Sequence, residues 1–184
     1  MKLNSTQQQQ LRNVARRAIE HGLQHGQPLI PPHKDCASEL LTQTASFVTL
    51  KRHGELRGCI GTLLPVRPLI DDVAHNAFAA AFRDARFAPL QENELDQLMI
   101  HLSVLGKPET LAFNSEQQLI AQLHPGVDGV ILSEGSLRAT FLPSVWETLP
   151  DPQAFLRQLK QKAGLPAHYW SDTMEFQRYA VDSF

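Results

Sequence analysis

Cys59 is the residue whose sequence surroundings most favour chemistry. It lies in the strand-like segment Leu56-Arg57-Gly58-Cys59-Ile60-Gly61. Side chains two positions apart share one face of a strand, so we expect Arg57 and Cys59 to point the same way. A guanidinium beside a thiol would stabilise the thiolate, the form that acts as a nucleophile or metal ligand. The same residue types also fit a buried cysteine that packs as a small hydrophobe.

Gly58 and Gly61 flank this cysteine, and a second segment of the chain manages without them. The pattern Val48-x-Leu50 followed by Gly54-x-Leu56-Arg57-Gly58-Cys59 is echoed by Val130-x-Leu132 and Gly135-x-Leu137-Arg138-Ala139-Thr140. Ala139 and Leu142 stand there in place of the two glycines, so hairpin geometry does not demand glycine. Glycine inside a strand indicates a bulge, or a close approach by another backbone or a ligand. We therefore count both glycines as candidate ligand-binding residues.

Two further segments supply candidate partners for the thiol. Arg83, Asp84 and Arg86 follow a predicted helix, where cations complement the helix dipole; alternatively, the two arginines clamp an anion. His101 shares a face of a predicted strand with Ser103, and either lines a cleft or lies on an exposed sheet face. We include Arg83, Asp84, Arg86 and His101 among the candidate ligand-binding residues.

The remaining histidines give weaker signals. His75 follows Asp71 by one helical turn, so the carboxylate is a candidate orienting partner, although solvation at the surface explains His75 equally well. His21 and His25 have metal-ligand spacing, but no cysteine or carboxylate is arranged nearby to complete a site. The sequence has no glycine-rich nucleotide loop, no nucleophile elbow, no HExxH and no CxxC. We therefore expect no metal site and find no cofactor evident.

The elements that must position these residues follow from hydrophobic spacing, capping residues and turns. A first helix has Ser5 or Thr6 as its N-cap and Gly22 or Gly26 beyond its end, and a proline-rich loop covers 27–35. The other expected elements are a hairpin of Phe47–Lys51 and Leu56–Thr62, a helix from Leu69 to Phe82, a strand over Leu98–Leu105, a short helix capped by Ser115, a second hairpin of Val127–Ser133 and Leu137–Leu142, helix starts at Pro143 and Asp151, and a closing strand over Thr173–Val181.

The echo between the two hairpins predicts related half-units at approximately 45–90 and 127–165, each a hairpin followed by proline and helix. We expect one domain over 1–184, with both hairpins in one sheet and the helix from about Leu69 to Phe82 packed on it; the alternative at this length is a two-lobed arrangement. A chance match between short strand-turn patterns would produce the same echo.

Composition limits the function classes. The chain has 184 residues, a formal net charge of -2 and no run of like charges, which disfavours nucleic acid as a partner. It has no apolar run of about 18 residues and no signal peptide, so we expect no membrane association and a cytoplasmic location. Its two cysteines, Cys36 and Cys59, are expected to be free thiols.

The segment Leu56-Arg57-Gly58-Cys59-Ile60-Gly61-Thr62 resembles the hallmark region of the AMMECR domain family, the A component of the AmmeMemoRadiSam set of proteins. Further matches follow in order along nearly the whole chain: Phe47-Val48-Thr49-Leu50-Lys51, Phe82-Arg83-Asp84-Ala85-Arg86-Phe87, Ser103-Val104-Leu105, Pro125-Gly126-Val127-Asp128-Gly129-Val130 and Ala139-Thr140-Phe141-Leu142-Pro143. The chain departs from the family pattern at Ala85, where proline is expected, and at His101, where an acidic residue is expected.

The resemblance implies an α+β fold, with duplicated β3-α2 halves around a single barrel-like, largely antiparallel sheet. It also implies Memo-type and radical SAM proteins as partners, while the family's own reaction is unassigned. Its motifs carry over to Arg57, Gly58, Cys59 and Gly61, and to Arg83, Asp84, Arg86 and Phe87.

Two hypotheses follow. In the first, a cleft beside Cys59 binds a small molecule, and Arg57 holds the thiolate as nucleophile or ligand. In the second, the chain is a non-catalytic interaction module, whose first hairpin and proline-rich loop present a surface to a partner.

Overall fold

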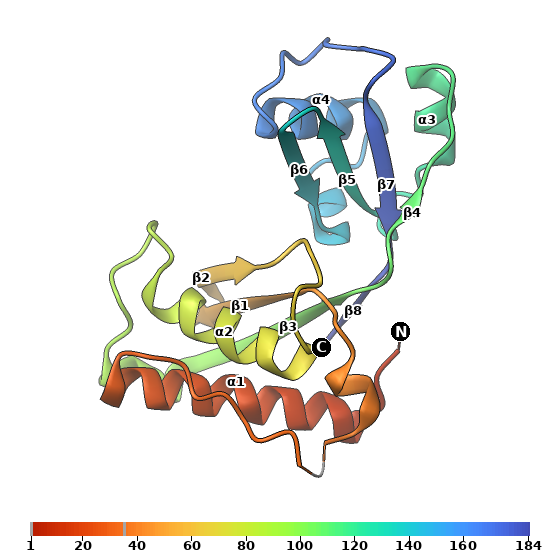
Figure 1. Cartoon of the computed structure of the whole chain (residues 1–184). Helices are drawn as coiled ribbons and strands as arrows, with labels where there is room; N and C mark the ends of the chain where they lie inside the picture. The colour runs from red at the N-terminus through yellow and green to blue at the C-terminus, as the bar shows by residue number, and fades with distance from the viewer. Residues whose placement is uncertain (1, 35) are drawn as a thin grey trace. The chain divides into compact units, whose positions relative to one another are not determined.

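A computed structural model describes residues 2–34 and 36–184 of the chain (Figure 1). The fold is α+β, with two four-stranded sheets in two compact units. Unit 1 comprises Met1–Leu105 with Asp182–Phe184, and unit 2 comprises Gly106–Val181. The predicted half-unit at 45–90 falls in unit 1, and that at 127–165 falls in unit 2.

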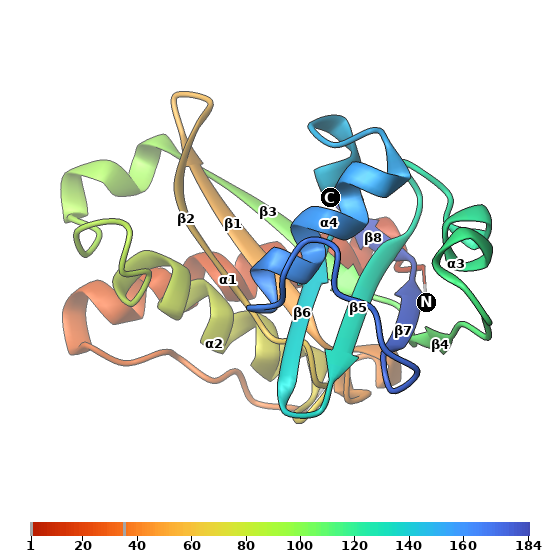
Figure 2. The same ribbon diagram turned by 90° about the horizontal axis from the view of Figure 1, so that it is seen from above.

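Unit 1 is a sheet covered by two helices. Its elements are α1 (Ser5–His25), the 3-10 turn η1 (Ser38–Leu41), β1 (Ser46–Arg52), β2 (Glu55–Gly61), α2 (Leu69–Phe82), the 3-10 turn η2 (Glu92–Gln97), β3 (Leu98–Leu105) and β8 (Val181–Ser183). The strand order is β2-β1-β3-β8, which leaves β2 at an edge. The hairpin β1–β2 with β3 beside β1 is visible in Figure 2.

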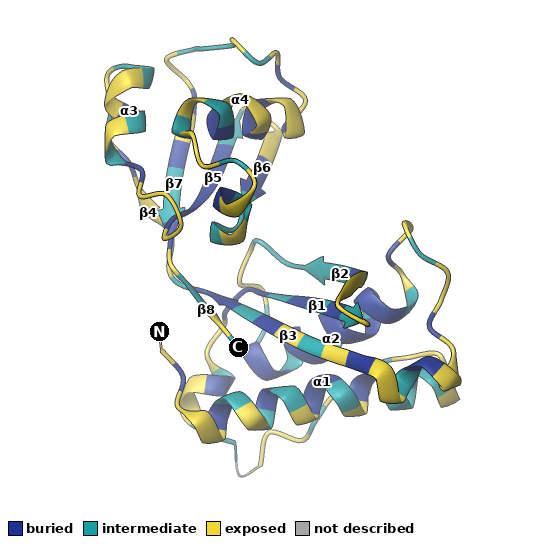
Figure 3. Cartoon of the chain, turned by 180° about the vertical axis from the view of Figure 1, so that it is seen from behind, coloured by how far each residue is buried: buried dark blue, intermediate teal, exposed yellow. Residues whose placement is uncertain are grey.

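The helices cover one face of this sheet. Val48, Leu50 and Leu102 alternate along β1 and β3 and are fully buried in one core with α1 and α2 (Figure 3). The intervening residues Thr49 and His101 belong to the other face, because side chains alternate along a strand. They are half-buried and exposed, respectively. The candidate residues on that face therefore lie away from the helices.

Unit 2 has a separate core. It comprises β4 (Glu109–Thr110), α3 (Glu116–Gln122), β5 (Gly129–Glu134), β6 (Leu137–Phe141), the 3-10 turn η3 (Pro143–Glu147), α4 (Pro152–Lys162) and β7 (Glu175–Tyr179), with strand order β4-β7-β5-β6. Trp146 stacks on Phe155 with ring centroids 3.7 Å apart, which joins η3 to α4. The fully buried Lys160 pairs with Glu116 and lies against the ring of Trp170.

The predicted single barrel-like sheet is wrong, because each hairpin belongs to its own sheet and neither sheet closes. The predicted closing strand over Thr173–Val181 is interrupted at Ala180. Its first part, β7, pairs with β5 in unit 2, whereas its last part, β8, joins the sheet of unit 1 beside β3. Each hairpin also has its own helical cover, α2 on β1–β2 and α4 beside β6. The described residues therefore form two hydrophobic cores, one in each unit.

Most predicted elements are present with small shifts in their ends. The strand over Leu98–Leu105 and the helix from Leu69 to Phe82 have the predicted bounds, and that helix packs on the first hairpin as expected. The first helix begins one residue earlier than a Ser5 cap would place it. Its cap is Asn4, which accepts from the Gln7 backbone while the Gln7 side chain accepts from the Asn4 backbone. None of the helices in the described residues combines the length and hydropathy that a membrane crossing requires.

Candidate functional site at Cys59

The edge strand β2 contains a bulge at Arg57. Leu50 pairs with Gly58 and the next residue, Lys51, pairs with Leu56, so Arg57 has no partner on β1. An extra residue interrupts the alternation of side chains along a strand. The expectation that Arg57 lies beside Cys59 depended on that alternation. The bulge agrees with the prediction, made from Gly58, that the strand is interrupted at this point.

The guanidinium of Arg57 is engaged with Glu94 in η2. Its Nε and Nη2 donate to the two oxygens of Glu94 at 2.8 and 2.9 Å, and Nη2 also donates to the Ala88 carbonyl at 2.9 Å. The side chains of Arg57 and Glu94 are only 14% and 10% exposed. The hydrogen bonds from Arg57 lower the pKa of Glu94 to about 2. Arg57 therefore connects the edge strand β2 to the segment after α2 that contains Ala88 and Glu94.

The thiol of Cys59 lies beside a hydroxyl on the neighbouring strand. Cys59 pairs with Thr49, and its Sγ is 3.2 Å from the Thr49 Oγ1. Because the Cys59 backbone N–H donates to Asp84, the Cys59–Thr49 pair is of the non-hydrogen-bonded kind, in which the two side chains are closest. The cysteine is half-buried and not in a disulfide.

Charged side chains from the loop after α2 hold both backbone groups of Cys59. Asp84 Oδ2 accepts the Cys59 N–H at 2.8 Å, and Arg86 Nη2 donates to the Cys59 carbonyl at 3.4 Å. Arg86 also binds Asp84 with two hydrogen bonds of 2.9 and 2.7 Å. These bonds from Arg86, and then the Cys59 amide, hold the pKa of the Asp84 carboxyl well below its usual range. The anion that Arg86 clamps is therefore Asp84.

Arg86 is the arginine that contacts Cys59, through the Cys59 carbonyl. Its pKa is raised mainly by the hydrogen bonds to Asp84. Arg83, in contrast, turns away: its guanidinium carbon lies 5.1 Å from the ring centroid of Phe78. Of the two arginines in this loop, only Arg86 reaches the cysteine.

Gly58 and Gly61 have packing roles within unit 1. A Cβ on Gly58 would lie 2.1 Å from the backbone oxygen of Ala80, so α2 approaches β2 at this residue. A Cβ on Gly61 would lie 2.2 Å from the Phe47 ring and 2.6 Å from the Ser46 oxygen. The close approach that the glycines predicted is made by groups of the same chain.

His101 lies in the same row of the sheet as Cys59. Thr49 pairs with Cys59 on one side and with His101 on the other, so all three belong to one face. His101 is exposed and lies two strands from the cysteine, about 10 Å at the usual strand spacing. This row brings together a thiol, a hydroxyl and an imidazole.

The weaker candidates lie elsewhere. The Asp71 Oδ1 lies 2.9 Å from the Nε2 of His33. The hydrogen-bond partner of Asp71 is therefore His33, whereas the sequence suggested His75. Burial, and then the charge of Arg67, lower the pKa of His75. The rings of His21 and His25 lie 4.3 Å apart. Among the described residues, no group of three or more metal-ligating side chains is close enough to hold an ion.

Two residues of this site gave no usable sequence signal. Thr49 is an ordinary strand residue, and only the pairing of β1 with β2 brings it to the thiol. Glu94 is one of three acids in Glu92–Asp96, and nothing in that run distinguishes the one that binds Arg57. Glu94 lies 37 residues from Arg57 in the sequence, so local periodicity cannot identify this partner.

Comparison with known proteins decides the family. The AMMECR1 family model matches residues 12–184. The chain belongs to the AMMECR1 family. A Thermotoga maritima relative, described only as a protein, is 38% identical over 171 residues, covering 91% of this chain and 92% of its own. A Methanothermobacter thermautotrophicus relative is 39% identical over 160 residues, with coverages of 86% and 83%.

The AMMECR1 fold seen here also has a close structural match. The crystal structure of an uncharacterised protein from Pyrococcus horikoshii has a TM-score of 0.91 and is 33% identical, covering all of this chain and 93% of its own. The names of these relatives do not state an activity. What a member of the AMMECR1 family does must therefore be argued from the site.

Proposed function

We propose that this chain binds a ligand on the sheet face around Cys59, with the thiol as the reacting or ligating group. The observation that carries the proposal is the way the cysteine is held. Its thiol contacts Thr49, and two charged side chains, Asp84 and Arg86, bind its backbone from outside the sheet. The thiol, the backbone N–H and the carbonyl of Cys59 each have a partner. A residue held in this way presents its side chain in one position, as a binding or catalytic group requires.

The other predicted site residues have distinct roles in this proposal. Arg86 holds the Cys59 carbonyl and Asp84, and His101 offers a second polar group across Thr49. Arg57 acts as a positioning residue, because its bonds to Glu94 and Ala88 fix the segment around the loop that carries Asp84 and Arg86. Gly58 and Gly61 set the distance of β2 from its neighbours.

A second candidate function is an interaction module, and exposed apolar residues favour it. Leu56 on β2, Met99 on β3, and Leu64 and Val66 after β2 are 42%, 55%, 52% and 58% exposed. Leu64 and Val66 lie two residues apart in the segment after β2, and exposed apolar side chains close to one another are typical of protein docking surfaces. The family resemblance points to Memo-type and radical SAM proteins as partners, and cytoplasmic location stays a prediction.

One experiment separates the two functions. Purified Memo-type and radical SAM proteins are tested for capture by wild type, Cys59→Ser and a Leu64→Ser/Val66→Ser variant, alongside complementation of a deletion strain. If the thiol is the functional group, Cys59→Ser abolishes complementation while capture and thermal unfolding stay unchanged. The matched control, Cys36→Ser, keeps full activity.

Full complementation by Cys59→Ser contradicts the thiol proposal. If the Leu64→Ser/Val66→Ser variant then loses capture and complementation together, the interaction module replaces it. A folded Cys59→Ser protein is established first by its unfolding transition, so that loss of function is not loss of fold.

A further inference from the structure

The sheet of unit 1 has an open face, away from the helices, and the strand register shows which side chains belong to it. Phe47, Thr49 and Lys51 are half-buried and alternate along β1 with the buried residues of the helix-covered face. Directly paired residues of neighbouring strands share a face, so the partners of these three residues belong to the open face as well. The partners are Gly61, Cys59 and Leu56 on β2, and Ser103, His101 and Met99 on β3.

Lys51 gives this open face its positive charge. Its neighbours in the same row, Leu56 and Met99, are apolar and cannot pair with its ammonium. Among the described residues of β1, β2 and β3, no aspartate or glutamate belongs to the open face. A ligand on this face therefore meets a cation and no carboxylate from these strands.

The carboxylates that bind residues of β2 from the segment after α2 do not offset this charge. Glu94 is bound by Arg57 and by Arg52, and Asp84 is bound by Arg86. Both carboxylates are thus balanced by arginines. The charge that remains on the open face is that of the lysine, and a surface of one sign attracts ligands of the other.

Lys51 also lies at a suitable distance from Cys59. Cys59 pairs with Thr49, and Lys51 is two residues further along β1. Diagonal neighbours of this kind are about 7–8 Å apart, a separation that long side chains bridge. An ammonium on a flexible four-carbon stem can therefore contact one end of a small molecule while the thiol contacts the other. The exposed imidazole of His101, on the far side of Thr49, adds a further polar group.

We propose that the ligand of the Cys59 site is a small anionic molecule, which Lys51 binds through its negative group while another part of it contacts the thiol. This inference rests on the proposed function of Cys59 and adds the class of ligand. Lys51 would attract an anion, repel a cation of the same size and give a neutral molecule no electrostatic advantage.

Two alkylating reagents of nearly the same size test this charge preference. Iodoacetate is an anion and iodoacetamide is neutral, and both react with the thiolate. The ratio of their rates at one cysteine is therefore independent of the fraction of thiolate, and it reports the charge that the reagent meets. Both rates are measured at Cys59 by mass spectrometry at low salt, and the same chain unfolded in urea gives the reference ratio.

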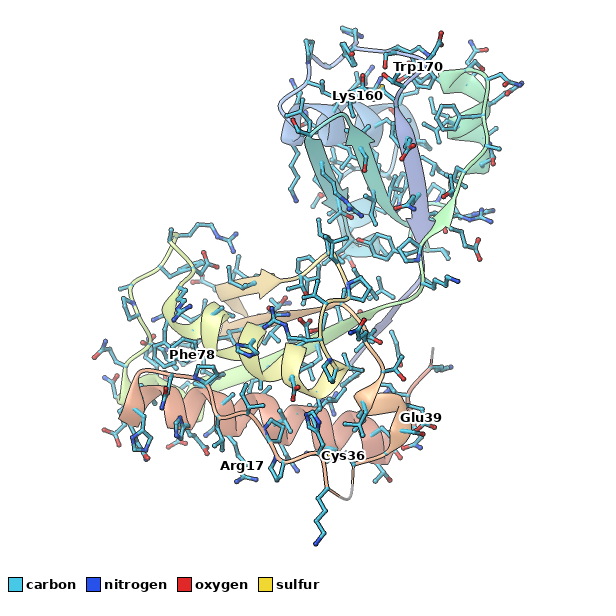
Figure 4. The ribbon with its side chains drawn as sticks, viewed as in Figure 1. Arg17, Cys36, Glu39, Phe78, Lys160 and Trp170 are labelled. Carbon is cyan, nitrogen blue, oxygen red and sulfur yellow. The ribbon has the colours of Figure 1, made fainter. Side chains whose placement is uncertain are left out.

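In the folded protein the ratio of iodoacetate to iodoacetamide rates at Cys59 should exceed the reference by about threefold or more, as expected for unit charges a few Å apart in water. Lys51→Gln should remove this excess, whereas Lys51→Arg should keep it. Lys2→Gln, which removes an exposed lysine outside the sheet, should leave the ratio unchanged. Cys36 is the control within the same molecule: it lies beside α1 (Figure 4), with its Sγ 3.7 Å from the Gln10 Nε2, and its ratio should not respond to Lys51.

A second measurement needs no variant. Salt screens exposed charges, with a Debye length of about 3 Å at 1 M, so the excess in wild type should largely disappear at about 1 M salt. Circular dichroism of Lys51→Gln and Lys51→Arg establishes that the substitutions keep the fold.

Three results overturn the anionic ligand: a ratio at Cys59 no higher than the reference, an excess that persists at high salt, or an excess that Lys51→Gln leaves unchanged. In each case the Cys59 proposal stands, because the thiol still reacts with iodoacetamide. A Cys59 that reacts with neither reagent in the folded protein overturns both proposals.

Discussion

Gly58→Ala tests how closely α2 approaches the strand that carries Cys59. The new Cβ would lie 2.1 Å from the Ala80 oxygen and 3.1 Å from its carbonyl carbon. Contacts between such atoms are not seen below 3.0 Å, so helix and strand must separate by about 1 Å. Overpacking of this kind costs about 1–3 kcal/mol, and we expect the upper half because backbone cannot rotate away.

Urea unfolding measures this cost. With a slope of about 2 kcal/mol per molar urea, the midpoint of unit 1 should fall by roughly 1 M. Adding Ala80→Gly should not rescue the variant, because the colliding oxygen belongs to the backbone. Gly54→Ala is the matched control in the same unit: its Cβ meets nothing within 4 Å, so only the strain of its φ of +85° remains, on the order of 1 kcal/mol. An unchanged midpoint in Gly58→Ala, or full rescue by Ala80→Gly, would refute the packing role.

Two further predictions concern buried charges of unit 1. Because Arg57 lowers the pKa of Glu94 to about 2, the ionised pair stabilises the fold above about pH 4.5, and this contribution is lost as the pH falls from 4.5 towards 2. In Arg57→Ala the free energy of unfolding should therefore be lower at pH 7, and it should fall less between pH 4.5 and pH 2; an unaltered pH profile would contradict the pairing. Asp72 is buried, and its Oδ2 accepts four hydrogen bonds, from the Ser46 amide and hydroxyl, Thr62 and Asn76. Asp72→Ala should cost about 3–5 kcal/mol by chemical denaturation, and a loss below about 1 kcal/mol would show that these donors find other partners.

The local elements were predictable because their signals are local. Gly54 and Gly135 both adopt positive φ in the hairpin turns, at 85° and 57°, as the turn pattern required. Alternation over Leu98–Leu105 placed that strand correctly. The pairing of strands that are distant in sequence has no local sequence signal. The residue type at Ala180 does not indicate that β7 and β8 belong to different sheets.

The candidate site was predicted only in part, because some of its features have local sequence signals and others depend on contacts between distant segments. Gly58 indicated a bulge or close approach, and the structure has both, at Arg57 and at Ala80. The bulge then removed the basis for pairing Arg57 with the thiol, because alternation assumes an unbroken strand. Asp84 and Arg86 reach Cys59 only because the loop after α2 folds along the edge of β2.

The most direct test of the Cys59 proposal is the rate of iodoacetamide modification of each cysteine, followed by mass spectrometry across pH. We expect Cys59 to react faster than Cys36 in the folded protein, and Arg86→Ala to slow Cys59 specifically because Arg86 binds the Cys59 carbonyl and holds Asp84 on the Cys59 amide. Arg157→Ala, the control for a lost exposed arginine, should leave both rates unchanged. A Cys59 that resists modification, or that reacts no faster than Cys36 and ignores Arg86→Ala, would contradict a reactive thiol at this site.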